Sequence, residues 1–284
     1  MATLPLAVPP VDALRRVRGL MFDLDGTLLL SDRALGGYEI LPGAVEVLTE
    51  LTRRGFPFVV LTNGSAYPPA QQAAKLRTLG LPVPDDRMLT PSSVTADVLR
   101  RRGVQRALIL GSRGVGHALQ EAGIEIAHPG DPGDREVQAV YVGWHPDCHM
   151  RDIEAACEAI WQGAKLYTAS DVPFFASKGG KAMGYSYAIV GAIRRMTRVP
   201  MTITGKPSMH ALSFVAKRLG VPRTAVGVIG DDPAVEMMMA RRGGAVGMGV
   251  TTGVMDAAMW NAESGVRRPD WVLSRLTDLL PHLG

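Results

Sequence analysis

Two pairs of carboxylates each close an apolar run of the sequence. The first pair is Asp23 and Asp25, and the second is Asp231 and Asp232. Carboxylates this close together repel one another unless a cation or a proton lies between them. Their oxygens are also the hard ligands that Mg²⁺ prefers. Asp23 and the second pair therefore predict a Mg²⁺ site, with waters and a phosphate completing the coordination shell.

Two further polar segments have the chemistry to bind phosphate. Thr62 and Asn63 follow an apolar run, where a hydroxyl and neighbouring backbone N–H groups suit phosphate oxygens, although Thr-Asn-Gly is also a good turn. Lys206 precedes a helix that we expect to begin at Pro207, so its ammonium would lie near the positive end of that helix and favour an anion. The glycine spacing of a Walker A loop is absent upstream of Lys206.

Strands of one sheet would hold these segments in place. Apolar runs alternate with helical patterns, which predicts an α/β fold with a doubly wound, mostly parallel, Rossmann-like core sheet. We expect core strands at residues 17–23, 56–61, 225–230, 245–250 and 271–273, and helices at 42–54, 68–79, 207–219 and 233–242. Ligands bind such sheets at the carboxyl ends of the strands, and the carboxylates and Thr62 lie at such ends.

A second α/β set interrupts this pattern. Its expected strands are residues 106–110, 137–143 and 165–168, and its expected helices are 153–160, 182–196 and one that Ser92 or Ser93 caps and that runs to about residue 102. The core pattern resumes after a strand at 201–204. We therefore expect a catalytic core of residues 1–90 and 203–284 with an inserted α/β cap domain, residues 91–202. Clefts between such domains are common ligand sites.

The composition is that of an ordinary globular protein. Of the 284 residues, 46% are hydrophobic and 20% are charged, and two cysteines are too few for a disulfide framework. Such cysteine usage fits a reducing, cytoplasmic setting. No apolar stretch is long enough to span a membrane, so we expect no membrane contact. The net charge of +4 is scattered over arginine pairs near predicted helix ends. Because no basic stripe appears, we expect no nucleic-acid partner.

Taken in order, the polar motifs resemble those of a known family, the haloacid dehalogenase (HAD) superfamily. The four matching motifs are Asp23-x-Asp25-Gly26-Thr27, Thr62-Asn63, Lys206 and Gly230-Asp231. The long insert resembles the class IIA subfamily of p-nitrophenyl phosphatases, phosphoglycolate phosphatases and pyridoxal phosphate phosphatases. The resemblance covers nearly the whole chain. It implies a small phosphorylated metabolite as substrate and is compatible with a homodimer.

The resemblance also implies a role for each motif residue. Asp23 would attack phosphorus and form an aspartyl phosphate, and Asp25 would act first as general acid and then as general base. Mg²⁺ would be held by the Asp23 and Asp231 carboxylates and by the Asp25 backbone carbonyl. Thr62, the Asn63 backbone and Lys206 would hold the phosphoryl oxygens. Because dehalogenases of the superfamily lack an acid at the position of Asp25, its presence favours phosphate chemistry.

The fourth motif departs from the family pattern. Relatives usually carry acids at the fifth and seventh positions counted from Gly230, where this chain has Ala234 and Glu236. We expect Asp232 or Glu236 to bind the metal through water or to orient Lys206. The sequence leaves open which acid does so.

Two segments of the cap carry weaker signals. His145, Cys148 and His149 lack a convincing fourth ligand for a structural zinc site, so we expect no zinc site there. Residues 168–171 resemble a Thr-Asn-x-Asp segment of the subfamily with Ala169 in place of Asn. Asp171 is therefore a candidate substrate contact, and a polar loop without function is the alternative.

Two other functions fit part of the pattern. A phosphotransferase or mutase would share the chemistry and differ in the acceptor, which product analysis would reveal. A non-catalytic binding protein would keep the fold alone. The complete set of catalytic and phosphate-binding residues favours a HAD-type phosphatase over the latter.

Overall fold

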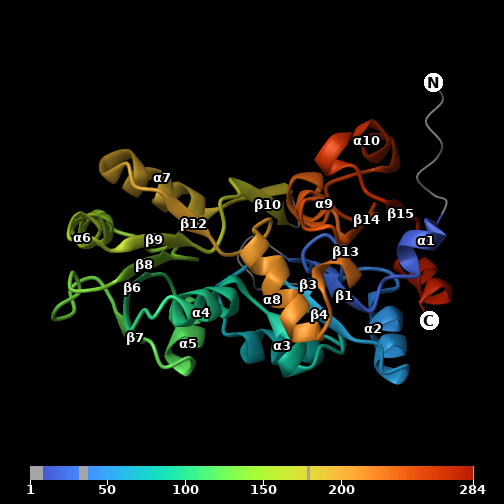
Figure 1. Cartoon of the computed structure of the whole chain (residues 1–284), viewed down its shortest axis with the longest axis horizontal. Helices are drawn as coiled ribbons and strands as arrows, with labels where there is room; N and C mark the ends of the chain where they lie inside the picture. The colour runs from blue at the N-terminus through green and yellow to red at the C-terminus, as the bar shows by residue number, and fades with distance from the viewer. Residues whose placement is uncertain (1–8, 32–37, 178–179, 284) are drawn as a thin grey trace.

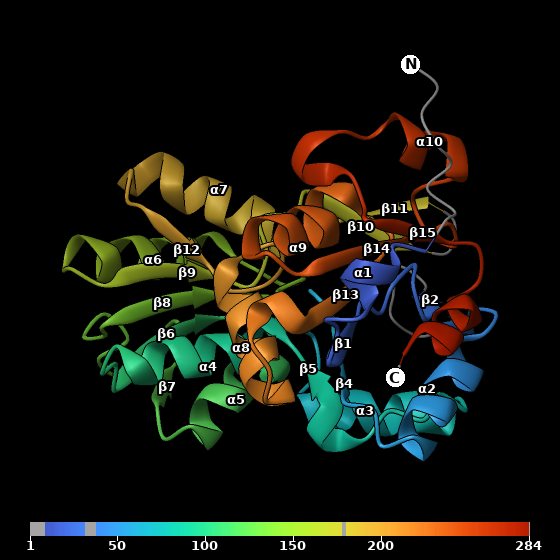
Figure 2. The same cartoon turned by 45° about the vertical axis from the view of Figure 1, so that its right-hand side comes forward.

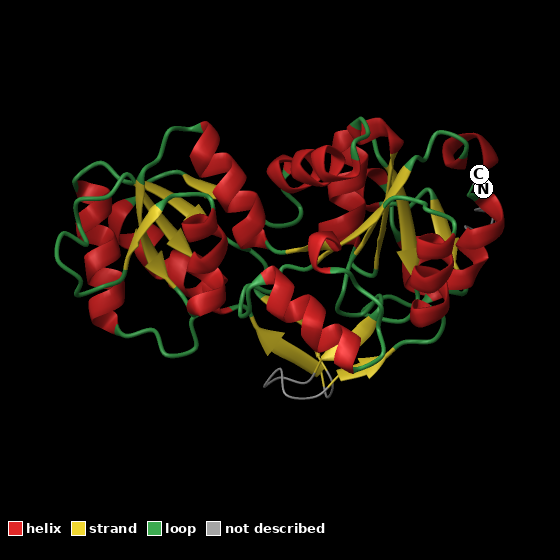
Figure 3. Ribbon diagram, turned by 90° about the horizontal axis from the view of Figure 1, so that it is seen from below, coloured by secondary structure: helices red, strands yellow, loops and turns green. Residues whose placement is uncertain are grey.

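A computed structural model describes residues 9–31, 38–177 and 180–283 of the chain. Its backbone forms two lobes, each built around its own parallel sheet (Figures 1 and 3). The larger lobe contains both the N-terminal and the C-terminal parts of the chain, and the middle of the chain forms the smaller lobe (Figures 1 and 2). This is the α/β architecture that the alternating pattern predicts.

The sheet of the larger lobe has six parallel strands in the order β15-β14-β13-β1-β4-β5. Their bounds are β1 Gly19–Phe22, β4 Phe58–Leu61, β5 Met88–Leu89, β13 Val226–Gly230, β14 Val246–Val250 and β15 Trp271–Leu273. Phe22 pairs with Ile229 on one side and with Val60 on the other. The carboxyl ends of β13, β1 and β4 therefore lie side by side.

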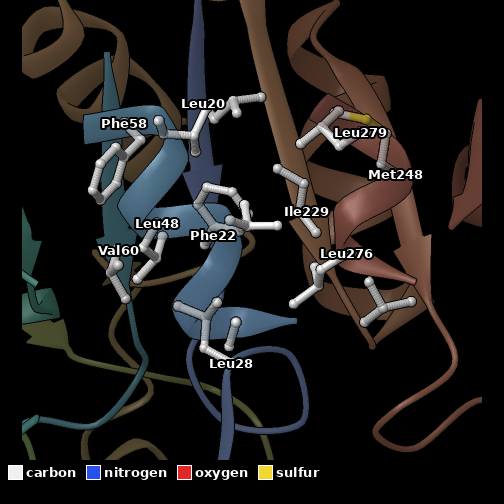
Figure 4. Packing of buried hydrophobic residues seen from close by; sticks show 14 of the residues in the cluster. Leu20, Phe22, Leu28, Leu48, Phe58, Val60, Ile229, Met248, Leu276 and Leu279 are labelled. Atoms are coloured by element: carbon white, nitrogen blue, oxygen red, sulfur yellow. The ribbon is translucent and has the colours of Figure 1, made fainter. Parts of the chain in front are cut away.

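Both faces of this sheet are covered by helices. On one face Leu20 and Phe22 of β1 pack with Leu48 of α2 (Ala44–Arg53), as Figure 4 shows. On the other face Met21 packs with Val215 of α8 (Met209–Leu219). Burial on both faces explains why these strands are continuous apolar runs rather than alternating ones.

The remaining elements of this lobe are short. They are the helices α1 (Val11–Leu14), α3 (Pro69–Thr78), α9 (Met238–Gly243) and α10 (Ala257–Ala262), the hairpin strands β2 (Leu29–Ser31) and β3 (Tyr38–Ile40), the 3₁₀ turns Asp85–Arg87, Arg223–Ala225, Gly265–Arg267 and Leu276–His282, and the π-helical turn Pro233–Met237.

The sheet of the smaller lobe has five parallel strands in the order β12-β9-β8-β6-β7. Their bounds are β6 Arg106–Leu110, β7 Glu125–Ala127, β8 Ala139–Val142, β9 Lys165–Thr168 and β12 Met201–Ile203. The pair α4 (Pro91–Arg101) and α5 (Arg113–Glu121) covers one face, and the pair α6 (Met150–Trp161) and α7 (Tyr185–Thr197) covers the other. A hairpin of β10 (Phe174–Ser177) and β11 (Gly180–Met183) follows β9.

We propose the division into a core of residues 1–90 and 203–284 and a cap of residues 91–202. The two sheets support it, because strands up to β5 lie in one sheet and strands β6 to β12 in the other. The second boundary falls at the end of β12, which pairs with β9 of the smaller lobe.

Expectations for four helices were wrong. Thr90, and not Ser92 or Ser93, caps α4, with Ser93 completing a capping box. Helix α8 begins at Met209 instead of Pro207, because the Ser208 hydroxyl accepts a hydrogen bond from the Ala211 N–H. The helix expected at residues 233–242 is a π-helical turn followed by α9. The helix expected at residues 182–196 begins at Tyr185, because the residues before it form strand β11, which pairs with β10.

Candidate active site

The candidate residues meet at the carboxyl edge of the six-stranded sheet. Asp23 follows β1, Thr62 follows β4 and Asp231 follows β13, and these three strands are neighbours. Lys206 reaches the same place from the end of β12. A single cavity is lined by Asp23, Asp25, Thr62, Asn63, Lys206, Asp231, Asp232 and Glu236. The structure thus brings together every residue expected to bind metal or phosphate.

Lys206 lies at the centre of a buried ion cluster. Its side chain is 2% exposed, and its Nζ forms ion pairs with Asp23 and, at 2.7 Å, with Glu236 Oε1. Burial alone would favour the neutral amine, but the charges of Asp23 and Glu236 outweigh it and raise the pKa of Lys206. The lysine is therefore a fixed positive charge beside Asp23.

Asn63 clamps the backbone of Lys206. Its Oδ1 accepts a hydrogen bond from the Lys206 N–H at 2.8 Å, and its Nδ2 donates to the Lys206 carbonyl at 3.0 Å. The side chain of Asn63 thus links the loop after β4 to the loop after β12. The hydroxyl of Thr62 accepts from the Gly64 N–H at 2.9 Å, which holds the turn that Thr62 begins.

The acids of the fourth motif divide between two tasks. Glu236 contacts Lys206, as described, and lies on the π-helical turn. Asp232 caps that turn, since its Oδ1 accepts from the Ala234 N–H at 2.7 Å. The geometry therefore assigns the contact with Lys206 to Glu236 and not to Asp232.

Asp231 is fixed by its surroundings. It is buried, and its Oδ2 accepts a hydrogen bond from the Val254 N–H at 2.9 Å. Gly26, with a φ of +89°, and Gly253 approach it so closely that a Cβ at either position would overlap its carboxylate. Burial, together with the charges of Asp23 and Glu236, raises the pKa of Asp231 well above its usual value.

Asp25 has the environment of a carboxylic acid that is protonated more easily than usual. Burial raises its pKa to about 6, against a lowering effect of its hydrogen bond from Ser31. The Ser31 hydroxyl donates to Asp25 Oδ1 at 2.5 Å. A proton donor and acceptor working near neutral pH needs a pKa in this region.

The smaller lobe supplies an apolar wall to the cavity. Trp144, which follows β8, packs edge-to-face on Tyr185 with ring centroids 4.6 Å apart, and Val172 and Phe174 line the cavity nearby. The backbone N–H of Trp144 donates a hydrogen bond to Ser65 Oγ at 2.9 Å, which connects this wall to the loop after β4.

The sequence did not identify the aromatic wall. The available signal for Trp144 was its position directly after an expected strand of the cap. Ser170 and Val172 line the cavity, whereas Asp171 is not among the described lining residues.

Comparison with known proteins places this site in a family. Residues 20–125 match the model of the haloacid dehalogenase-like hydrolases, and residues 203–279 match a second, HAD-hydrolase-like model. The chain belongs to the haloacid dehalogenase superfamily. Its relatives and structural neighbours place it among the class IIA members of that superfamily.

Individual members of the HAD superfamily align with nearly the whole chain. A 5′-nucleotidase of Bacillus subtilis is 23% identical over 95% of this chain and its own full length. The crystal structure of a 4-nitrophenylphosphatase from Thermotoga maritima superposes with a TM-score of 0.83, at 25% identity, over 95% of this chain and 98% of that one. A glycerol phosphate phosphatase from Mycobacterium tuberculosis, solved in complex with magnesium, shares the fold with a TM-score of 0.81 at 24% identity, over 94% of this chain and 77% of that one.

In the part of the chain that the structure describes, no helix is long and apolar enough to cross a bilayer.

Proposed function

We propose that this phosphoric monoester hydrolase cleaves small phosphate monoesters with the help of Mg²⁺, through an aspartyl phosphate on Asp23. The observation that carries the proposal is the position of the Asp23 carboxylate. It lines the cavity beside the ammonium of Lys206 and within reach of Asp231, and Asp25 lies two residues further on. A nucleophile, a fixed positive charge and an acid therefore line one cavity.

The residues present fit Mg²⁺. Carboxylate oxygens of Asp23, Asp231 and Glu236 lie within 4.8 Å of one another in a buried cluster. Three carboxylates against one lysine leave an excess of negative charge that a divalent cation would balance. As the family resemblance implies, Asp23 and Asp231 would hold the metal with the Asp25 backbone carbonyl, while Glu236 keeps its ion pair with Lys206. When bound, Mg²⁺ would neutralise charge on the phosphoryl oxygens.

The chain's own residues provide the two steps of hydrolysis. An Asp23 oxygen attacks phosphorus, so that a new oxygen–phosphorus bond forms while the bond to the leaving oxygen breaks. Asp25 gives its proton to that leaving oxygen. In the second step the Asp25 carboxylate takes a proton from water, whose oxygen attacks phosphorus and releases phosphate from Asp23. The raised pKa of Asp25 suits this exchange of a proton.

The cavity wall points to an uncharged, organic leaving group. Among the described lining residues Lys206 is the sole cation, and its charge is shared by Asp23 and Glu236. The wall supplied by the smaller lobe includes the aromatic pair Trp144 and Tyr185 and the apolar side chain of Val172. The name of the Bacillus subtilis relative, a 5′-nucleotidase, agrees with a small phosphorylated substrate.

Asp171, which lies in the sequence between the lining residues Ser170 and Val172, remains a proposed substrate contact. If it touches substrate, Asp171→Ala will raise KM or change the substrate preference. Unchanged kinetics over a panel of phosphate esters would exclude that role.

The proposed activity is tested by phosphate release from p-nitrophenyl phosphate. The wild type should release phosphate with Mg²⁺, and this release should stop in excess chelator. Asp23→Asn should be inactive under both conditions. Adding an alcohol acceptor separates the alternatives, because a phosphotransferase would pass the phosphoryl group to the alcohol. Activity that persists in Asp23→Asn would refute the role of this residue.

A further inference from the structure

A second cluster of metal-ligating side chains lies in the smaller lobe, outside the catalytic cavity's ion cluster. His145, Cys148 and Asp152 each offer one ligand atom, and these atoms lie within 4.8 Å of one another. Among the described residues, one other cluster has its ligand atoms this close together, the catalytic one of Asp23, Asp231 and Glu236. The two differ in chemistry, because the cap cluster combines sulfur, nitrogen and oxygen.

We propose that His145, Cys148 and Asp152 form a binding site for a transition-metal ion of the Zn²⁺ type. The ion would have three protein ligands and water in the fourth position, which is the coordination of open zinc sites in proteins. Such an open site does not need the fourth side chain whose absence argued against a closed structural site.

Local structure explains why these three side chains meet. Residues 146 and 147 form a turn between β8 and α6, which places His145 and Cys148 at its two ends. Two ligands separated by two residues are the common spacing of metal-binding turns. Asp152 is the third residue of α6, whose N-cap is His149, so it lies in the first turn of the helix that follows Cys148.

The distances agree with tetrahedral coordination. His145 Nε2 and Asp152 Oδ2 are 3.4 Å apart. Two ligands at zinc bond lengths of about 2.0–2.2 Å, separated by a tetrahedral angle, lie roughly 3.4 Å apart. The thiol of Cys148 lies within 4.8 Å of both other ligand atoms, so a rotation of its short side chain would bring it to the metal.

The surroundings of Asp152 support a ligand role. Its Oδ2 accepts a hydrogen bond from the His149 N–H at 2.7 Å, and carboxylates that bind metals are commonly oriented by such bonds. The side chain of Asp152 is 9% exposed and that of His145 is 19% exposed, so the ligands are sheltered but open to solvent on one side. Arg151 lies 3.8 Å from Asp152 Oδ1, but its side chain is 79% exposed and free to turn outward.

Metal at this site would have a consequence for the cap. The ligands lie directly after Trp144, which forms part of the cavity wall. An ion that joins β8's exit to the first turn of α6 would therefore stiffen the segment that carries Trp144.

Cobalt titration of the whole, metal-free protein tests the site. Excess Mg²⁺ is added first to occupy the carboxylates of the catalytic cavity. We expect one Co²⁺ per chain with a thiolate-to-cobalt charge-transfer band, which Zn²⁺ removes by competition. Cys148→Ser should abolish the band, whereas Cys157→Ser, a matched change at a buried cysteine on the core-facing side of α6, should keep it.

A second variant guards against misfolding of Cys148→Ser. His145→Gln should bind Co²⁺ at least about tenfold more weakly while its thermal unfolding without metal matches the wild type. No band in the wild type would overturn the proposal. A band that survives in Cys148→Ser, or an affinity unchanged in His145→Gln, would overturn it as well.

Discussion

Gly253 allows the proposed metal ligand Asp231 to be moved without changing any catalytic group. A methyl group at this position would lie 2.6 Å from Asp231 Cβ and would overlap the carboxylate. Because carbon atoms normally approach to about 3.5 Å, the carboxylate or its loop must shift by roughly 1 Å. The backbone of Gly253 is outside the left-handed region, so alanine adds no strain of its own.

A shift of this size should damage catalysis more than stability. Mg²⁺ demands near-ideal octahedral geometry, and a misplacement of about 1 Å in a catalytic constellation costs roughly 100-fold. We expect Gly253→Ala to need about 10- to 100-fold more Mg²⁺ for half-maximal activity. The assay is hydrolysis of p-nitrophenyl phosphate over a Mg²⁺ titration, with thermal unfolding measured in parallel.

Gly191→Ala is the matched control for this substitution. Gly191 lies on α7 with open space around its Cβ position. Its replacement should leave the Mg²⁺ dependence unchanged and stabilise the fold by up to about 1 kcal/mol. If Gly253→Ala keeps the wild-type Mg²⁺ dependence and kcat/KM, the Asp231 carboxylate is not a direct ligand of the metal.

Two further substitutions test the cavity wall and the contact between the lobes. Trp144→Ala should lower kcat/KM for phenyl phosphate by about 10- to 100-fold and for ethyl phosphate by much less, and equal losses on both esters would argue against an aromatic leaving-group wall. Partial burial opposes ionisation of Asp97, but hydrogen bonds from Lys217 and Arg101 hold its pKa below the usual value. Its contribution to stability is therefore present above the unfolded pKa and is lost as the pH falls through the folded one. Asp97→Asn should cost at most about 1 kcal/mol in urea unfolding at pH 7, and the difference from wild type should shrink as the pH falls below about 4; a difference that grows in acid would contradict this reasoning.

The sequence predicted the features that depend on local pattern. Strands such as β1 and β4 are buried on both faces, and this requirement makes them continuous apolar runs that are visible in the sequence. The acids after β1 and β13 could be found because function places them at the carboxyl ends of those runs.

Features that depend on tertiary contacts could not be predicted in the same way. The hairpin of β2 and β3 has three residues in each strand, too few for a period to show. The division of work between Asp232 and Glu236 depends on the π-helical turn, which brings Glu236 to Lys206. Trp144 and Asp152 gained their roles only when the turn after β8 was placed in space.

A pre-steady-state measurement on Asp25→Asn tests the covalent role of Asp23 most directly. Nitrophenolate is a good leaving group that departs with little help from an acid, whereas hydrolysis of the aspartyl phosphate needs the base that this variant lacks. Mixed rapidly with p-nitrophenyl phosphate and Mg²⁺, Asp25→Asn should release a burst of about one nitrophenolate per chain and then turn over slowly, and adding Asp23→Asn should remove the burst. A burst that persists without the Asp23 carboxylate would contradict a phosphoryl group carried on Asp23. Slow release from Asp25→Asn with no burst and no accumulated phosphoenzyme would contradict it as well.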